Sequence, residues 1–497
     1  MTIISAAYIL LFLPLLSSLL CQISPKKNIA YLISVISVLF LIFLSLGLFK
    51  KIWILQNVEN NFALFPLSLA LEFKINSISM MFFIVIILLK IFTLFYYQQD
   101  IKNFLNEKNS RIFYAVFCLK IFAIAGILTS NNFLNFFLFL EIYSISFLAF
   151  FSISRDKKIA KISFSYFFCN AAASLILLFC FLIIYINFTS LNFDFVKENL
   201  LKSENSILFK TLSLLIFFCI IVKFFPFWIY FENLKNTNLF ANFFAIDTLF
   251  IKANLGLFVI FKFYYLFFGK ISISLILIFL AIILSFYSAF RIFQSKHFKI
   301  IVINFCLNNF AFILICLVLK NEQALKAVFF YWLNFNLIAF FLFIFATFLK
   351  RKFATSLIDR IAILTESKQF YGNNFLLLPL KLILIFIAAF PFTFLFYANF
   401  NLSLASLEFA ALLQYHFAIF ISPFIITSLI ISQFSLFIFA CKIMLLSFEK
   451  NDRKITAKRY EYWFHVISFL AIILVIYVLI INAGFLNELS IKFAQYE

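Results

Sequence analysis

The chain of 497 residues is 65% hydrophobic and only 12% charged, and 83 of its residues are phenylalanine. This composition excludes a soluble domain and is typical of a polytopic membrane protein that is solvated by the lipid bilayer. The net charge of +20 lies in short polar breaks between apolar runs, a pattern that orients membrane proteins, so we expect no nucleic acid partner.

A helix of about 20 apolar residues crosses the hydrocarbon core of a bilayer, and the chain contains about 14 such runs. The first has no Lys or Arg before it and no small-residue cleavage site after it, so we expect a span and not a cleaved signal peptide. A hairpin in the run 408–447 would raise the count to about 15. The predicted spans are 3–24, 28–49, 77–97, 111–129, 131–153, 160–187, 207–231, 238–268, 271–291, 299–319, 324–349, 373–400, 408–447 and 461–484.

Positive charge gathers in the breaks after odd-numbered spans, from Lys26 and Lys27 after the first to the basic segment 450–459 after the thirteenth. These breaks are expected to face the cytoplasm or matrix. Breaks after even-numbered spans are poorer in charge, for example TSNN at 129–132. Both termini are therefore predicted on the opposite side. The polar breaks are too short to bury a core of their own, so we expect no soluble domain.

Glu141 interrupts the apolar run LNFFLFLEIYSISFLAFF near the middle of the fifth span. A carboxylate at this depth costs at least about 2.5 kcal/mol, so it is by default a functional residue with a partner. Asn135 and Ser144 add to a polar stripe, which predicts that this side of the helix faces other helices and not lipid. A static ion pair is the alternative interpretation.

Lys223 lies in the seventh span, three residues before Pro226. The proline must locally break the backbone hydrogen-bond ladder, and a broken helix beside a charge is common in transporters. The alternative is a lysine near its helix end whose ammonium group reaches the membrane surface.

Lys252 lies in the middle of the eighth span, with Asp247 five residues before it. Its depth makes contact with the membrane surface difficult, and a buried lysine that can release and regain a proton is what a proton carrier requires. Three further lysines lie nearer to span ends or lack polar neighbours, and we interpret them as reaching the surface or as packing residues: Lys90, Lys120 and Lys381.

A Glu in the fifth span, a Lys beside a Pro in the seventh and a Lys in the eighth resemble the antiporter-like family. This family comprises the large proton-pumping membrane subunits of respiratory complex I and the homologous subunits of Mrp-type cation/proton antiporters. The LNFFLFLE of residues 134–141 resembles the pattern FNLFVFFE of the D-type Mrp subunit, with Glu141 in register. Pro226 precedes Lys252 by 26 residues, which is the family's spacing from a PFHxWLPDA-like segment to the eighth-span Lys. More diffusely, the resemblance covers about residues 75–400.

The chain departs from the family pattern at several positions. The family Lys usually stands five residues before the proline, whereas Lys223 stands three before it, and two residues of α-helix rotate a side chain by about 200°. Either two residues were lost there or Lys223 is not the equivalent residue. Phe335 and Ala339 correspond to a His and a Lys often found in the eleventh span. The segment AFPFTFLFYAN resembles a family pattern GxPPxxGFxxK, in which the final Lys becomes Asn399.

The resemblance implies an all-α membrane protein of about 14 helices, with two inverted five-helix repeats and broken helices in spans 7 and 12. Glu141 would set the charge state of Lys223, which would pass a proton to Lys252, with Asp247 and Asn399 as possible accessory residues. The implied segments are helices 1–3 at 1–110, the first repeat at 111–268, a degenerate second repeat at 269–447, and a loop with helix 14 at 448–497.

The function that the resemblance favours is proton or cation/proton translocation as the D-type subunit of an Mrp-type antiporter. A proton-pumping subunit of complex I, of the N, M or L type, is the second hypothesis. Either role implies other membrane subunits as partners, in a bacterial cytoplasmic (inner) membrane in preference to the mitochondrial inner membrane. A hypothesis of another class is a degenerate structural subunit that does not conduct, because Asn399 cannot carry a proton as an ammonium group does.

The sequence contains no pattern for a metal or a redox cofactor. Its eight cysteines have no CxxC spacing and no nearby His, so we interpret them as packing residues. A Rossmann glycine pattern, iron–sulfur cysteine spacing and a flavin motif are also lacking. We therefore expect no cofactor, no metal and no catalytic residue, and any NADH-quinone oxidoreductase activity would belong to a complex.

Overall fold

The computed structural model of the chain is dominated by helices. It describes residues 3–55, 62–63, 72–153, 157–202, 207–224, 243, 246–267, 271–319, 321–353, 393–412 and 416–446. Within these ranges, ten helices are long and apolar enough to cross a membrane. The chain divides into two compact units, residues 1–273 and 274–497, and each is described by itself.

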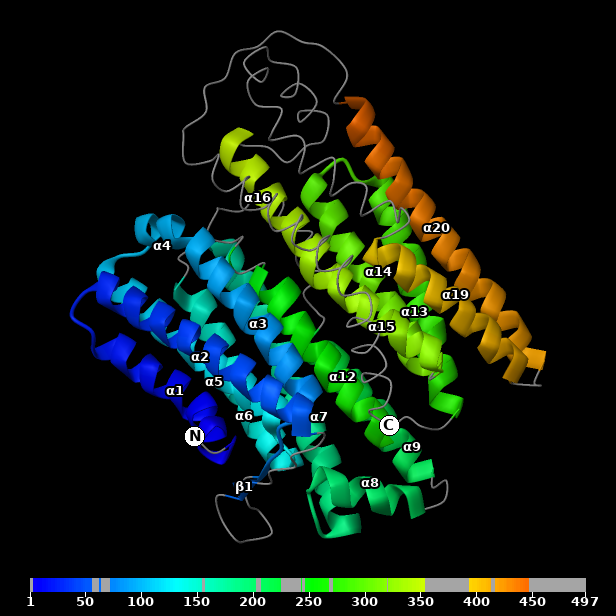
Figure 1. The fold of residues 1–497 in the computed structure, drawn as a ribbon, viewed down its shortest axis with the longest axis horizontal. Coiled ribbons are helices and arrows are strands. Elements are labelled where there is room, and N and C mark those ends of the chain that lie inside the picture. The colour runs from blue at the N-terminus through cyan, green and yellow to red at the C-terminus, as the bar shows by residue number, and fades with distance from the viewer. Residues whose placement is uncertain are drawn as a thin grey trace. The chain divides into compact units, whose positions relative to one another are not determined.

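The first unit is organised around α5 (Glu107–Thr129), which packs against α1, α2, α3 and α6 (Figure 1). The side chains of α5 are buried along most of its length, because apolar neighbours cover it on several sides. The other described helices of the first unit are α1 (Ile3–Ile23), α2 (Lys27–Leu55), α3 (Ser77–Tyr96), α4 (Gln98–Phe104), α6 (Phe133–Ile153), α7 (Lys157–Phe188), α8 (Phe193–Lys202), α9 (Ile207–Phe224), the π-helix η2 (Asp247–Lys252) and α12 (Ala253–Phe267).

Two local features fix the approach of neighbouring segments in this unit. Gly126 lets α5 pack directly on α6, because a Cβ at this position would lie 2.1 Å from a ring carbon of Phe139. Strands β1 (Phe62–Ala63) and β2 (Glu72–Phe73) pair antiparallel. The strand pair lies at the end of the unit where α5 passes into α6, and β2 contacts that connection.

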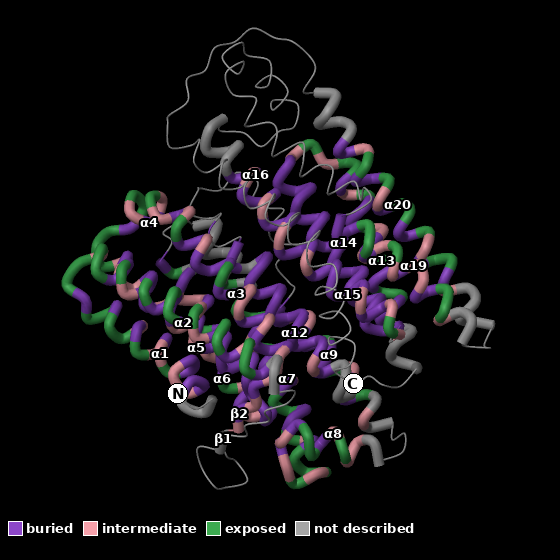
Figure 2. Tube along the Cα trace, viewed as in Figure 1, coloured by how far each residue is buried: buried purple, intermediate pink, exposed green. Residues whose placement is uncertain are grey.

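The second unit surrounds α14 (Phe298–Leu319), in which all 22 residues are buried (Figure 2). A helix that is apolar on every side is stable only when protein or lipid covers it all round, and here α15, α16 and α19 contact it. The other elements are α13 (Ile271–Gln294), α15 (Glu322–Asn334), the π-helix η3 (Phe335–Ala339), α16 (Phe340–Phe353), α19 (Phe394–Leu412) and α20 (His416–Leu446).

The predicted spans agree with the described helices except near residue 400. The twelfth span was expected to end at 400, but α19 continues to Leu412, and α20 begins at His416 where 408 was expected. The polar side chains of Asn401 and Ser403 donate hydrogen bonds to carbonyls of their own helix, so they do not end it. Residues 416–446 form one helix and not a hairpin. The predicted span 461–484 lies outside the described residues.

Candidate functional site

Glu141 on α6 and Lys223 on α9 form an ion pair inside the first unit. The Nζ of Lys223 lies 2.9 Å from Oε1 of Glu141, and its side chain is 2% exposed against 30% for Glu141. The pairing expected from the sequence is therefore present. The alternative in which the Lys223 ammonium reaches the membrane surface is wrong, because the group is buried against a carboxylate. Pro226, which was expected to break this helix, lies outside the described residues.

Ser174 on α7 completes this ion pair and was not anticipated from the sequence. Its hydroxyl donates to Oε1 of Glu141 (2.6 Å) and accepts from Nζ of Lys223 (2.5 Å). The same hydroxyl lies 2.9 Å from the carbonyl of Asn170 on its own helix. Helix α7 packs against both α6 and α9, which places the serine beside both charges. A polar residue in the apolar run NAAASLIL was the only signal in the sequence.

The predicted polar stripe of α6 is directed into the protein. The amide of Asn135 donates to the carbonyl of Glu72 (3.0 Å), and Asn135 is fully buried. Ser144 is also buried and donates to a carbonyl of its own helix. The expectation that this face meets other parts of the protein is confirmed.

Asp247, at the start of η2, forms ion pairs with two lysines of other helices. Its Oδ1 lies 2.5 Å from Nζ of Lys90 on α3, and its Oδ2 contacts Nζ of Lys120 on α5. Neither lysine side chain is exposed. The interpretation of Lys90 and Lys120 as surface-reaching or packing residues is therefore wrong. Their partner lies more than 120 residues away in sequence, so local sequence gave no sign of it, and Lys381 lies outside the described residues.

Lys252 ends the π-helix that begins with Asp247, and 1% of its surface is exposed. In a π-helix the backbone hydrogen bond joins residues five apart, so Asp247 and Lys252 are separated by about one turn. Five residues of α-helix would instead be well past one turn of 3.6 residues. The Nζ of Lys252 lies 5.0 Å from the ring centroid of Phe147 on α6. The buried lysine thus faces the same region as the Asp247 ion pairs.

In the second unit an amide, Asn399, and an apolar residue, Phe335, stand where the resemblance suggested charge. The hydroxyl of Tyr331 donates to Oδ1 of Asn399 (2.6 Å), and the amide of Asn334 donates to Oδ1 of Asn309 (2.8 Å). Phe335, which corresponds to the family His, is buried in η3. Asn399 therefore belongs to a hydrogen-bonded contact between α15 and α19 within the described part of this unit.

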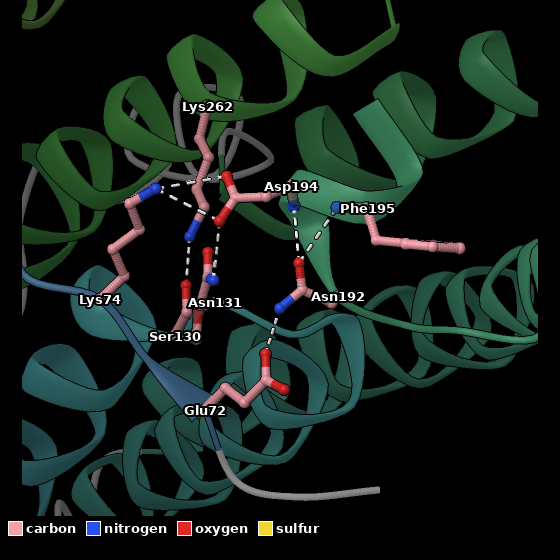
Figure 3. Close-up of polar contacts among 8 residues, drawn as sticks. All are labelled: Glu72, Lys74, Ser130, Asn131, Asn192, Asp194, Phe195 and Lys262. Atoms are coloured by element: carbon pink, nitrogen blue, oxygen red, sulfur yellow. Dashed lines mark hydrogen bonds and ion pairs between the residues drawn. The ribbon is translucent and has the colours of Figure 1, made fainter. Parts of the chain in front are cut away.

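Three extended segments meet at one end of the first unit, namely β2, the α5–α6 connection and the α7–α8 connection. The backbone N–H of Asn131 donates to the backbone carbonyl of Glu72 (2.9 Å), and the backbone carbonyl of Asn131 accepts from the backbone N–H of Phe193 (3.0 Å). Side chains reinforce this junction (Figure 3). We call the following residues the end cluster: Glu72, Lys74, Ser130, Asn131, Asn192, Asp194 and Lys262.

Asp194 is the centre of the end cluster. It pairs with Lys74 at 3.2 Å and accepts from the amide of Asn131 at 3.0 Å (Figure 3). Nearby, Lys262 of α12 donates to the carbonyl of Ser130. Because Asp194 is 51% exposed, the charge pair contributes little energy. Backbone hydrogen bonds join the ends of α5, α6 and α8 here, from Phe133 to Leu191 and from Phe193 to Asn131.

Comparison with known proteins gives the family and the fold. Residues 130–431 match the family model described as NADH:quinone oxidoreductase/Mrp antiporter, TM. A search of curated proteins finds no match.

Three solved structures illustrate the shared fold. The first is the membrane-bound sulfane sulfur reductase, an archaeal respiratory membrane complex, with 18% identity, 98% of this chain and 96% of that chain covered, and a TM-score of 0.75. The second is the Mrp complex from Dietzia sp. DQ12-45-1b, with 16% identity, 92% and 82% covered, and a TM-score of 0.75. The third is respiratory complex I from Thermus thermophilus with bound NADH, with 16% identity, 98% and 99% covered, and a TM-score of 0.70.

Proposed function

Because the chain belongs to the NADH:quinone oxidoreductase/Mrp antiporter membrane family, we propose that Glu141, Lys223 and Lys252 carry protons through its first unit. The observation that supports this most directly is the 2.9 Å ion pair between Glu141 and Lys223. Two opposite charges from different helices meet there in an otherwise apolar interior. Ionisable side chains at this depth are costly, so their presence indicates a function by default.

Opening and closing of this ion pair would move the proton. While the pair is closed, the carboxylate of Glu141 stabilises the ammonium form of Lys223. When it opens, the ammonium is left without its counter-ion in a medium of low polarity and gives up its proton. The proton then passes through water to the neutral amine of Lys252. Ser174 assists opening, because its hydroxyl can turn from Glu141 to the carbonyl of Asn170.

We favour the D-type subunit of an Mrp-type antiporter, because residues 134–141 resemble the pattern of that subunit with Glu141 in register. A complex I subunit is the second candidate, since this chain and its Thermus thermophilus counterpart match over 98% and 99% of their lengths. Both candidates place the protein beside other membrane subunits, and we place it in a bacterial cytoplasmic membrane. Mass spectrometry of the purified native complex distinguishes them by the partner subunits found.

A structural subunit that does not conduct is a third candidate. Asn399 and its partner Tyr331 are uncharged hydrogen-bonding groups, and such groups can order water but cannot store a charge. This candidate predicts that no ionisable residue of the first unit affects flux.

Proton flux into vesicles that contain the purified complex, followed with a pH-sensitive dye, tests the proposal. Glu141→Gln and Lys252→Met should each lower flux at least tenfold in complexes that assemble normally. Ser152→Ala is the matched control on α6, because the exposed Ser152 donates to a carbonyl of its own helix. Wild-type flux in both charge variants would refute the proposed path and leave the structural candidate.

A further inference from the structure

Asp247, Lys90 and Lys120 form a buried cluster with an excess of positive charge. One carboxylate lies between two ammonium groups, and none of the three side chains is more than 2% exposed. We call these three residues the Asp247 cluster. Its formal charge is +1 when all three residues are ionised, and burial leaves that charge poorly screened by solvent.

Aromatic rings lie beside both lysines of the Asp247 cluster. The Nζ of Lys90 lies 4.9 Å from the ring centroid of Phe117. The Nζ of Lys120 lies 4.3 Å from that of Phe150 and 4.5 Å from that of Phe147. Cations are attracted to the faces of such rings within about 6 Å. The rings and the shared carboxylate are both groups that attract an ammonium ion.

The ring of Phe147 connects the Asp247 cluster with Lys252. Lys252 places its Nζ 5.0 Å from this ring centroid, on which Lys120 also lies. Asp247 and Lys252 are the first and last residues of the same π-helix. Within the described part of the chain, the charged groups that interact with Lys252 include Lys223 on α9, Lys120 on α5 and Asp247 on its own helix. Lys90 on α3 acts through its pair with Asp247.

A purely structural role, in which the cluster only holds helices together, explains this arrangement less well than a functional role does. Holding α3, α5 and η2 together requires no charge, since buried ion pairs can often be replaced by apolar side chains without loss of stability. An unbalanced cluster is costlier than a balanced pair. Its position beside the last lysine of the proposed path suggests a use for the extra charge.

We propose that the Asp247 cluster supplies a positive charge that lowers the proton affinity of Lys252 and so favours onward release of the proton that Lys252 has received from Lys223. This inference rests on the proposed path through Lys252. Repulsion from Lys120 prevents Lys252 from retaining the proton, so the proton passes on instead of remaining on Lys252. Asp247, Lys90 and Lys120 do not bind the moving proton and act only through Lys252.

The test removes the excess charge but keeps one ion pair. Lys120→Met leaves the 2.5 Å pair of Lys90 with Asp247 intact and makes the cluster neutral. The flux of the whole reconstituted complex is measured as a function of pH. The alkaline limb of the profile should move to higher pH by about one unit, because one unit charge within about 10 Å of Lys252 acts with that strength.

Two further variants serve as controls. Lys120→Arg keeps the charge and should keep the wild-type profile. Lys326→Met removes a lysine from an ion pair of the second unit, the one with Glu322, and should also leave the profile in place. If Lys120→Met does not assemble, Lys90→Met neutralises the cluster from the other side and should produce the same displacement.

An unmoved profile in an assembled Lys120→Met or Lys90→Met complex overturns the inference and leaves the cluster as a structural tie. Lys252→Met in the same vesicles separates this result from failure of the proposed function. If Lys252→Met abolishes flux while the cluster variants leave the profile unmoved, only the present inference is lost. If Lys252→Met keeps wild-type flux, the path itself is wrong and the inference falls with it.

Discussion

Removal of either charge of the Glu141–Lys223 pair should have unequal effects, because the protein covers the two groups to different extents. Lys223 is 2% exposed and Glu141 30%. Glu141→Gln leaves a buried ammonium without a counter-ion, whereas Lys223→Gln leaves a carboxylate that still accepts a hydrogen bond from Ser174. We therefore expect Glu141→Gln to be the more damaging of the two substitutions.

The magnitude follows from the geometry of the pair. At 2.9 Å and an effective dielectric constant of about 20, the attraction is about 6 kcal/mol before the cost of desolvation. Breaking a buried pair from one side typically costs about 3–5 kcal/mol, which we expect for Glu141→Gln. For Lys223→Gln we expect about 1–3 kcal/mol, the cost of a poorly satisfied polar group. The coupling energy between the two substitutions should be about 2–3 kcal/mol.

A double-mutant cycle measures this coupling. Glu141→Gln, Lys223→Gln and the combined variant are purified in their complex, and both thermal unfolding and proton flux are recorded. The combined variant should be more stable than Glu141→Gln alone, because no unpaired ammonium remains. If the effects of the two single substitutions simply add, the side chains do not interact in the membrane, and the proposed switch is refuted.

Three other outcomes are expected. Asn399→Lys should raise proton flux if the rest of the path in the second unit is intact, at some cost in stability for a new buried charge; a fall in flux in an assembled complex would contradict this. Gly126→Ala should lower the unfolding free energy by about 1–3 kcal/mol, because the new Cβ would collide with a phenylalanine ring of α6. Gly47→Ala is its control, since nothing lies within 4 Å of a Cβ there, and equal unfolding temperatures would contradict the reasoning. In a background without native cysteines, a cysteine at Lys27 should react with an impermeant reagent only from the cytoplasmic face and one at Asn192 only from the other face; the reverse pattern would overturn the predicted orientation.

The helices of the fold were largely predictable because hydrophobic length is a direct requirement of a bilayer. Most described spans begin and end within a few residues of their predicted bounds. The prediction was wrong around residue 400, where Asn401 and Ser403 bond to their own helix and hydropathy alone suggested a break. The short helix α8 (Phe193–Lys202) was also not anticipated in a polar connection. The inverted relation of the two repeats stays a prediction.

The candidate site was predictable only in part, since a charge inside an apolar run is visible in sequence but its partner is not. Glu141 and Lys223 were recognised from their depth in the spans. Asp247 was grouped with Lys252, its neighbour on the same helix, whereas the structure pairs it with Lys90 and Lys120. Which helix faces meet depends on packing between α3, α5 and η2, and no local pattern encodes that arrangement.

The first residues of α6 are held by hydrogen bonds, so a tilt of the helix about that end moves Glu141 relative to Lys223. Its first amide, at Phe133, donates to the carbonyl of Leu191, and the junction of extended segments around Asp194 holds that end in place. Glu141 lies eight residues along, about 12 Å from the pivot at 1.5 Å per residue. A tilt of about 5° at the pivot would displace Glu141 by about 1 Å and stretch its 2.9 Å contact with Lys223 beyond hydrogen-bonding distance. A rotation of a few degrees is therefore sufficient to part the two charges.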